Sequence, residues 1–259
     1  MPVLVAVPGT MCAPSVFRRL AERLTERTGR PGEPADRPGE PAGLSGESAG
    51  RSGDVVRLDA VSWMTEPGPW DIATIADRIA LRHSEPVLVL GHSTGGAIAL
   101  QLAVSHPRLV AGLLVVDSGA HMHGHGDVDR ILATVETGWG PKLHKAVLDR
   151  SFATPPGAAD RAELLDYAAM VPRQAALDAL RSQRELDLTP RLAELRCPVT
   201  VLHGVLDPTR TLEQARDLAA AIPGARLRYL DTGHTPVYEA PDLVATEVIA
   251  LCDRIPGLR

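Results

Sequence analysis

Cysteine, long apolar runs and excess positive charge are all scarce in this sequence, and each scarcity argues against a class of protein. The three cysteines, Cys12, Cys197 and Cys252, lie far apart and form no C-x-x-C pair, which favours a reducing compartment and predicts no zinc site. No apolar run approaches the roughly 18 residues of a membrane-spanning helix. The formal net charge of −5 gives no support for binding to nucleic acid or to an anionic membrane.

The rest of the composition is that of a globular chain. The 259 residues are 44% hydrophobic and 23% charged, which suits one domain with room for an inserted subdomain. The segment Met1–Leu4 leads straight into an apolar stretch and lacks the features of a signal peptide. We therefore expect a cytoplasmic protein.

One segment, residues 29–53, differs in kind from the rest. It consists largely of Gly, Pro, Glu, Ser and Arg, and residues 30–35 (RPGEPA) recur as residues 37–42. Such a composition cannot bury enough apolar surface to offset the entropy lost on ordering. The sequence predicts a disordered surface insertion here; a proline-rich docking segment is the alternative.

Short apolar runs alternate with helical patterns over most of the chain. Strands are predicted at residues 3–7, 54–58, 86–90, 110–116, 198–203 and 225–230. Helices are predicted at residues 14–27, 70–83, 96–103, 210–222 and 239–255. A strand joined to the next strand by a helix implies an α/β fold: a mostly parallel sheet of about six strands with helices on both faces.

The alternation stops between residues 118 and 196, where only helical patterns occur. These lie near residues 129–136, 141–151, 158–169 and 172–186. We interpret residues 118–196 as a helical cap, or lid, over the carboxyl edge of a core formed by residues 1–117 and 197–259. Most large apolar residues of the cap should pack its own core. The candidates for facing a substrate pocket are Trp139, Phe152, Tyr167 and Met170.

The pattern G-x-S-x-G at residues 91–95 is the strongest chemical signal. It follows a predicted buried strand and opens a predicted helix, which is the context of a nucleophile elbow. Gly91 and Gly95 leave room where a Cβ would clash, and the sharp turn places the Ser93 hydroxyl above the sheet at the positive end of the helix. Ser93 is therefore the candidate nucleophile.

Two further motifs follow the late strands. The segment His203–Pro208 contains Asp207, and the run Asp231–Pro236 contains His234. The order Ser93, Asp207, His234 resembles the α/β-hydrolase fold over nearly the whole chain. The run GHSTGG at residues 91–96 is similar to that of small bacterial esterases, lactonases and cofactor-free haloperoxidases or perhydrolases.

The chemistry of each group fits the roles that this resemblance implies. His234 can take the Ser93 proton and return it near neutral pH, and Asp207 can hold the imidazole in the required tautomer. Asp117, which ends an earlier strand, is the alternative acid. The oxyanion hole should use the backbone N–H of Thr94 together with that of Thr10, or that of Met11 if the register differs by one.

The sequence departs from the family pattern in three places. Pro8–Gly9 stands where relatives commonly have His-Gly, and the segment at residues 29–53 has no counterpart. The chain begins directly at the strand leading to the first turn, so a shortened sheet is expected.

Other histidines invite a metal interpretation, which we do not favour. His121, His123 and His125 alternate in a glycine-bearing loop without a carboxylate partner or an established ligand spacing, so lid-hinge or pocket-edge positions are expected. His92 should pack beside the elbow. Neither a metal nor a cofactor is predicted.

The sequence thus predicts a serine hydrolase that cleaves an ester, lactone or thioester of a small, partly apolar substrate through an acyl-enzyme. Two alternatives use the same fold: C–C bond hydrolysis, elimination or perhydrolysis with the same triad, and a non-catalytic small-molecule receptor with a vestigial triad. A small molecule is the expected partner, with neither nucleic acid nor membrane. The identity of the substrate and the oligomeric state stay open.

Overall fold

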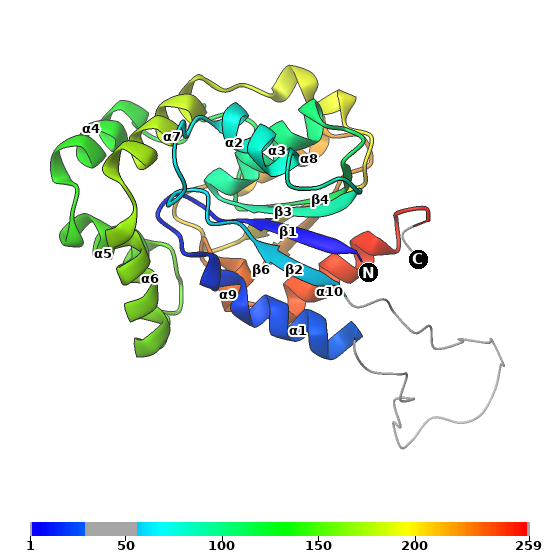
Figure 1. Ribbon diagram of the computed structural model, residues 1–259, viewed down its shortest axis with the longest axis horizontal. Helices are drawn as coiled ribbons and strands as arrows, with labels where there is room; N and C mark the ends of the chain where they lie inside the picture. The colour runs from blue at the N-terminus through cyan, green and yellow to red at the C-terminus, as the bar shows by residue number, and fades with distance from the viewer. Residues whose placement is uncertain (1, 29–55, 258–259) are drawn as a thin grey trace.

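The computed structural model describes residues 2–28 and 56–257 (Figure 1). Six strands form one sheet in the order β2-β1-β3-β4-β5-β6, and all neighbouring strands are parallel. The strands are β1 (Val3–Val7), β2 (Arg57–Ala60), β3 (Val87–His92), β4 (Val110–Val116), β5 (Val199–Gly204) and β6 (Arg226–Leu230). The predicted α/β fold with a six-stranded parallel sheet is confirmed. The predicted insertion at residues 29–53 lies outside the described residues.

Burial follows the position of each strand in the sheet. All six residues of β3 and of β5 are buried, because helices cover both faces of the sheet there. The edge strands are less buried: β2 is mostly half-buried and β6 is mostly exposed, and both carry arginines, among them Arg57, Arg226 and Arg228. Charged side chains on an edge strand discourage pairing with another chain.

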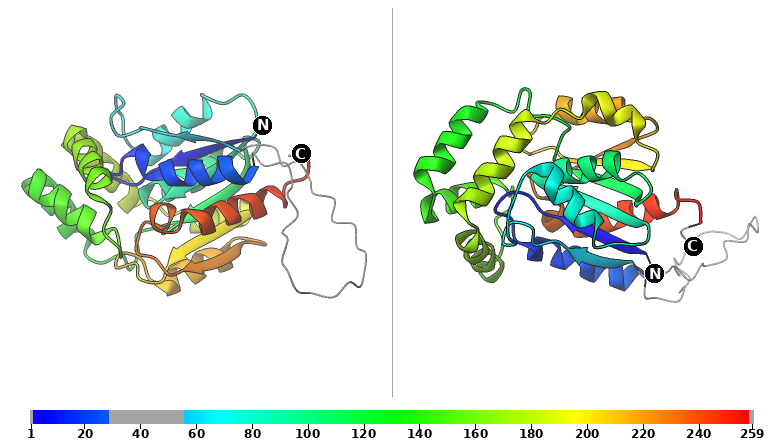
Figure 2. Two further views of the ribbon diagram at one scale, coloured as in Figure 1. Left: turned by 90° about the horizontal axis from the view of Figure 1, so that it is seen from below. Right: turned by 45° about the horizontal axis from the view of Figure 1, so that its top comes forward.

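The helices form a layer on each face of the sheet (Figures 1 and 2). One layer holds α1 (Arg18–Thr28) and α10 (Pro241–Cys252), which pack on each other, and the other holds α2 (Ile72–Ala80), α3 (Thr94–Ser105) and α8 (Leu212–Ala221). The predicted helix at residues 14–27 is split into the 3₁₀ turn η1 (Pro14–Phe17) and α1. The predicted last helix, at residues 239–255, corresponds to α10, and a short helix that was not predicted, α9 (Pro236–Glu239), precedes it. Pro241 lacks a backbone N–H and fits the first turn of a new helix.

Between β4 and β5 the chain is helical, as predicted. This segment contains α4 (Val128–Gly138), α5 (Pro141–Arg150), α6 (Ala158–Met170), α7 (Arg173–Glu185) and the 3₁₀ turn η2 (Thr189–Glu194). Figure 1 shows α4–α7 grouped beyond the carboxyl ends of the strands. In a parallel sheet the loops at this edge carry the functional groups, so the helices lie over the place where a site is expected.

None of the helices in the described part of the chain combines the length and the apolar character needed to cross a lipid bilayer.

Candidate active site

The turn between β3 and α3 has the strained geometry of a nucleophile elbow. Ser93 adopts φ 55° and ψ −126°, in a region that costs a non-glycine residue on the order of 1–3 kcal/mol. A Cβ at Gly91 would lie 2.3 Å from the Gly95 carbonyl oxygen, and a Cβ at Gly95 would lie 2.0 Å from the Val7 carbonyl oxygen. Glycine is needed at both positions because backbone approaches so closely.

We expect Gly95→Ala to lower the free energy of unfolding by about 1–3 kcal/mol, because its methyl group must displace the backbone of β1. The matched control is Gly138→Ala, at the exposed end of α4, where a Cβ would have no atom within 4 Å. That control should change stability by less than about 1 kcal/mol. Urea denaturation measures both; a Gly95→Ala protein as stable as the wild type would contradict the proposed packing.

A chain of two hydrogen bonds links Ser93 to His234 and His234 to Asp207. The His234 Nε2 atom lies 2.9 Å from Ser93 Oγ, and Nδ1 lies 2.7 Å from Asp207 Oδ2. Asp207 follows β5 and His234 follows β6, at the same edge of the sheet as Ser93 after β3. The three side chains are therefore brought together from positions far apart in the sequence.

The electrostatics of Asp207 favour its ionised form. Burial alone would raise the pKa of Asp207, but hydrogen bonds from His234 and from the backbone N–H of Thr209 outweigh burial and hold the pKa below its ordinary value. An ionised carboxylate on Nδ1 keeps the proton on that nitrogen and leaves Nε2 free to accept the proton of Ser93.

Asp117, the alternative acid, contacts a different histidine. Its Oδ1 atom lies 2.9 Å from His203 Nδ1 and accepts the backbone N–H of Gly204 at 2.9 Å. Its Oδ2 atom is buried without a hydrogen-bond partner among the described residues. Burial raises the pKa of Asp117 to about 6. The structure thus places Asp207, and not Asp117, on His234.

The raised pKa of Asp117 predicts a pH-dependent effect of Asp117→Asn on stability. Between about pH 4 and pH 6 the folded protein keeps a proton on Asp117 that the unfolded chain has lost. The contribution of Asp117 to the free energy of unfolding therefore falls as the pH rises through this range. Asparagine cannot lose that proton. The variant should gain stability relative to the wild type over this range, by up to about 3 kcal/mol for two pKa units. Urea denaturation from pH 4 to pH 7 measures the difference; a flat difference would contradict the assignment.

Two backbone amides are available beside Ser93. Among the described residues, the N–H groups of Thr94 and Thr10 have no hydrogen-bond acceptor. The amide of Met11, the second choice from sequence, donates to Met64 Sδ at 3.0 Å. Thr10 and Thr94 are also joined through their hydroxyls, 2.8 Å apart. Of the two first-turn candidates, Thr10 is therefore the free donor.

Residues after β2, which sequence reasoning missed, support this first turn. The Trp63 indole donates to the Pro8 carbonyl at 2.9 Å, next to the Met64 contact with Met11. A Cβ at Gly9 would lie 2.8 Å from Ser93 Cβ, so the turn packs directly on the elbow. Pro8–Gly9 in place of the common His-Gly thus still brings the turn to Ser93.

His92 and Cys12 have neutral side chains near Ser93. His92 Nε2 lies 2.7 Å from the His234 carbonyl oxygen, and burial lowers the pKa of His92 to about 3. Burial raises the pKa of the Cys12 thiol to about 12, so Cys12 carries no thiolate that would compete with Ser93. His92 therefore packs beside the elbow and fixes the backbone that carries the catalytic candidate His234.

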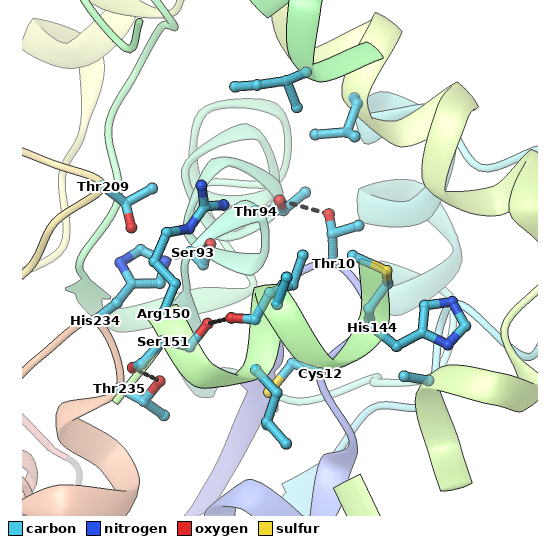
Figure 3. Close-up of a pocket in the computed structure, with 18 of the residues that line it drawn as sticks. Thr10, Cys12, Ser93, Thr94, His144, Arg150, Ser151, Thr209, His234 and Thr235 are labelled. Carbon is cyan, nitrogen blue, oxygen red and sulfur yellow. Dashed lines mark hydrogen bonds between the residues drawn. The ribbon is translucent and has the colours of Figure 1, made fainter. Parts of the chain in front are cut away.

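A cavity of about 400 Å³ opens over Ser93 (Figure 3). Its core end is polar and includes Thr10, Ser93 and His234, and much of its other side consists of apolar side chains from α4, α5 and α6. Those are Ile131, Val135, Leu143, Ala146, Val147, Leu148, Leu164, Leu165 and Ala168. Such a site suits a ligand with one polar reacting group and an apolar body.

Only one of the four pocket residues predicted from sequence is among the lining residues, namely Phe152. The prediction was wrong for the other three. Trp139 packs edge-on against His144, with ring centroids 4.8 Å apart. The Tyr167 hydroxyl lies 3.5 Å from Ser62 Oγ, and Met170 is 67% exposed. Periodicity identified the apolar positions of these helices but not which of them turn toward the cavity.

The sequence matches the family described as "Alpha/beta hydrolase family" over residues 4–247. This chain belongs to the alpha/beta hydrolase family. It is 30% identical over 202 residues to a pimeloyl-[acyl-carrier protein] methyl ester esterase of Edwardsiella ictaluri, which covers 73% of this chain and 77% of that relative. The protein is therefore a hydrolase, and the predicted family is confirmed.

Solved structures share the fold of this alpha/beta hydrolase at lower sequence identity. An esterase from Exiguobacterium antarcticum superposes with a TM-score of 0.77 at 17% identity, covering 98% of this chain and 92% of its own. An enol-lactonase from Burkholderia xenovorans gives a TM-score of 0.74 at 19% identity, covering 97% and 91%. These structural similarities establish the fold but do not identify the substrate.

In this alpha/beta hydrolase, the three histidines of the loop at residues 121–125 do not converge on one point. His121 and His123 stack, with ring centroids 4.6 Å apart, whereas His125 lines the cavity. Within residues 2–28 and 56–257, the three do not form a group with metal-ligand spacing. His125 is at the pocket edge, which is one of the positions expected from sequence.

One group of this alpha/beta hydrolase does have metal-ligand spacing: ligand atoms of Asp117, His203 and Asp207 lie within 4.8 Å of one another. Hydrogen bonds already engage the facing atoms, because Asp117 Oδ1 meets His203 Nδ1 and Asp207 Oδ2 meets His234 Nδ1. A cation there would compete with the bond that orients His234.

Proposed function

We propose that this alpha/beta hydrolase cleaves a carboxylic ester through an acyl-enzyme on Ser93. The observation that carries the proposal is the continuous hydrogen-bonded chain from Ser93 through His234 to Asp207, at the floor of a cavity. The name of the relative from Edwardsiella ictaluri, a methyl ester esterase, supports the same reaction class. Lactones and thioesters present the same carbonyl group and are included.

The proposed first step is acylation. Ser93 Oγ attacks the carbonyl carbon while its proton moves to His234 Nε2, and Asp207 stabilises the resulting imidazolium. The N–H groups of Thr10 and Thr94 donate to the oxyanion. When the intermediate collapses, the alcohol leaves with the proton from His234 and the acyl group stays on Ser93.

Hydrolysis of the acyl-enzyme repeats these steps with water. Water attacks the acyl carbon as its proton moves to His234, the oxyanion again contacts Thr10 and Thr94, and the Ser93–acyl bond breaks with return of the proton to Ser93. The carboxylic acid is released and the enzyme is restored. No cofactor takes part in either step.

We further propose that residues 118–196 act as a cap on a core of residues 1–117 and 197–259. Its apolar side chains would hold the body of the substrate while the core supplies the reacting groups. The three cysteines are free, which supports a reducing, cytoplasmic location.

Steady-state kinetics on matched substrates test this function. We expect turnover of p-nitrophenyl butyrate well above the buffer rate, with slower formation of peracid from acetate and hydrogen peroxide. A folded protein that binds the ester without turning it over would favour the receptor alternative. Peracid formation or C–C cleavage faster than ester hydrolysis would instead assign the triad to one of the other two reactions.

A further inference from the structure

A buried arginine lines the cavity of the proposed esterase without a carboxylate partner. Arg210 is 5% exposed and follows Asp207 by three residues. Its Nη1 atom donates to the His121 carbonyl oxygen at 3.0 Å. Among the described residues, no acidic oxygen lies within 4.0 Å of its guanidinium. A buried cation without a counter-ion is costly, and its persistence at a ligand cavity suggests that a ligand supplies one.

The neighbouring acid, Asp207, does not neutralise Arg210 by direct contact. Asp207 uses Oδ2 for His234 and Oδ1 for the Thr209 backbone N–H. Burial lowers the pKa of Arg210 to about 10, against the opposing effect of the Asp207 charge. Arg210 therefore keeps its positive charge at neutral pH, and most of its five N–H donors stay available.

The other charges around the cavity are also mostly positive. Arg130 and Arg150 line it, whereas Asp117 is its one acidic side chain among the described lining residues. Asp117 is occupied by His203 and its pKa is raised by burial. Figure 3 shows the Arg150 side chain reaching from its helix toward the end of the pocket that holds Ser93, His234 and Thr209. Apart from Asp207, which is bonded to His234, the charged side chains around the cavity are therefore mostly positive.

We propose that the substrate of this enzyme carries a carboxylate on the part of the molecule that does not react, and that Arg210 binds it. This inference rests on the proposed ester hydrolysis. The planar guanidinium fork matches a carboxylate with two N–H donors, and desolvation strengthens the pair. The apolar side chains of α4–α6 would contact the methylene groups between the carboxylate and the ester. The substrate class is then the half-ester of a dicarboxylic acid.

Arg210 has one structural contact that gives a competing explanation. Its bond to the His121 carbonyl ties down the segment after β4, and a Cβ at Gly119 would lie 3.0 Å from Nη1. A purely structural arginine would affect charged and neutral substrates equally. The charge dependence of turnover therefore separates the two roles.

The test compares mono-p-nitrophenyl adipate, which carries a free carboxylate, with its neutral methyl ester. The corresponding pair of suberate esters tests a longer chain between the two carbonyl groups. For the wild type, we expect kcat/KM at least about tenfold higher for the anionic ester of the better pair. Arg210→Gln should lower the ratio of anionic to neutral kcat/KM about 100-fold, mostly through KM, because removing one partner of a buried ion pair typically has an effect of this size. Arg210→Lys should restore part of the ratio.

The matched control is Arg108→Gln, which removes the same charge from the exposed segment before β4, at the opposite edge of the sheet. It should leave the ratio unchanged. A wild-type ratio of anionic to neutral kcat/KM of one or less overturns the inference, even if Arg210→Gln fails to fold. An equal loss of kcat/KM for both esters in Arg210→Gln also overturns it. If the folded wild type hydrolyses neither ester, the proposed function itself fails.

Discussion

Replacing Ser93 by alanine is expected to lower kcat for ester hydrolysis by about 10⁵–10⁶-fold, the loss typical of removing the nucleophile of a serine triad. The reason is geometric. Ser93 Oγ is the oxygen that lies 2.9 Å from His234 Nε2 at the cavity floor, and alanine leaves only the weak effect of the oxyanion donors. Initial rates with p-nitrophenyl butyrate measure the loss.

The matched control for this substitution is Ser105→Ala, at the exposed end of the same helix, α3. It removes the same hydroxyl and should keep the wild-type rate within about twofold, since surface changes have small effects. Retention of more than a few per cent of the activity in pure Ser93→Ala would show that another group performs the reaction.

Asp207→Asn is expected to lower kcat by about 10⁴-fold, with little change in KM. Asparagine keeps the shape of the side chain but favours the wrong tautomer of His234 and withdraws the negative charge that stabilises the imidazolium. The Asp207 carboxylate is the one 2.7 Å from His234 Nδ1. Steady-state kinetics, together with a thermal unfolding curve to verify the fold, measure the effect.

Asp117→Asn is the comparison that decides between the two acids. Asp117 contacts His203 and Gly204, and an asparagine oxygen can accept the same bonds. We expect less than about a tenfold loss of kcat. A larger loss for Asp117→Asn than for Asp207→Asn would assign the acid to the end of β4 instead of the loop after β5.

Much of the fold was predictable because the relevant signals are local. Continuous apolar runs predicted the buried strands β3 and β4, since strands covered on both faces need no alternation. The elbow was predictable for a similar reason. The close backbone contact around Ser93 requires glycine at positions 91 and 95, and the G-x-S-x-G motif contains both glycines.

The sequence could not show which cap residues face the cavity. Tyr167 and Ala168 are adjacent on α6, yet Ala168 lines the cavity while Tyr167 turns toward Ser62. This choice depends on how α6 is rotated against its neighbours, which periodicity does not record. Large size was a poor guide, since Met170 points outward and smaller side chains line the pocket.

The residues that support the site were hidden for a different reason. Trp63 and Met64 fix the first turn through contacts separated by more than 50 residues, and nothing in their own neighbourhood indicates this role. Arg210 is next to a recognised motif, but whether an arginine is solvated or buried without a carboxylate depends on tertiary packing. Its position three residues after Asp207 was the one available signal.

Labelling with a fluorophosphonate, followed by intact mass measurement and peptide mapping, tests the central claim that His234 activates Ser93. The reagent should add one phosphonyl group per wild-type chain, on Ser93, and should react at least 100-fold more slowly with His234→Ala because the base is missing. Folded wild-type protein that stays unlabelled, or that is labelled at another residue, would contradict the claim.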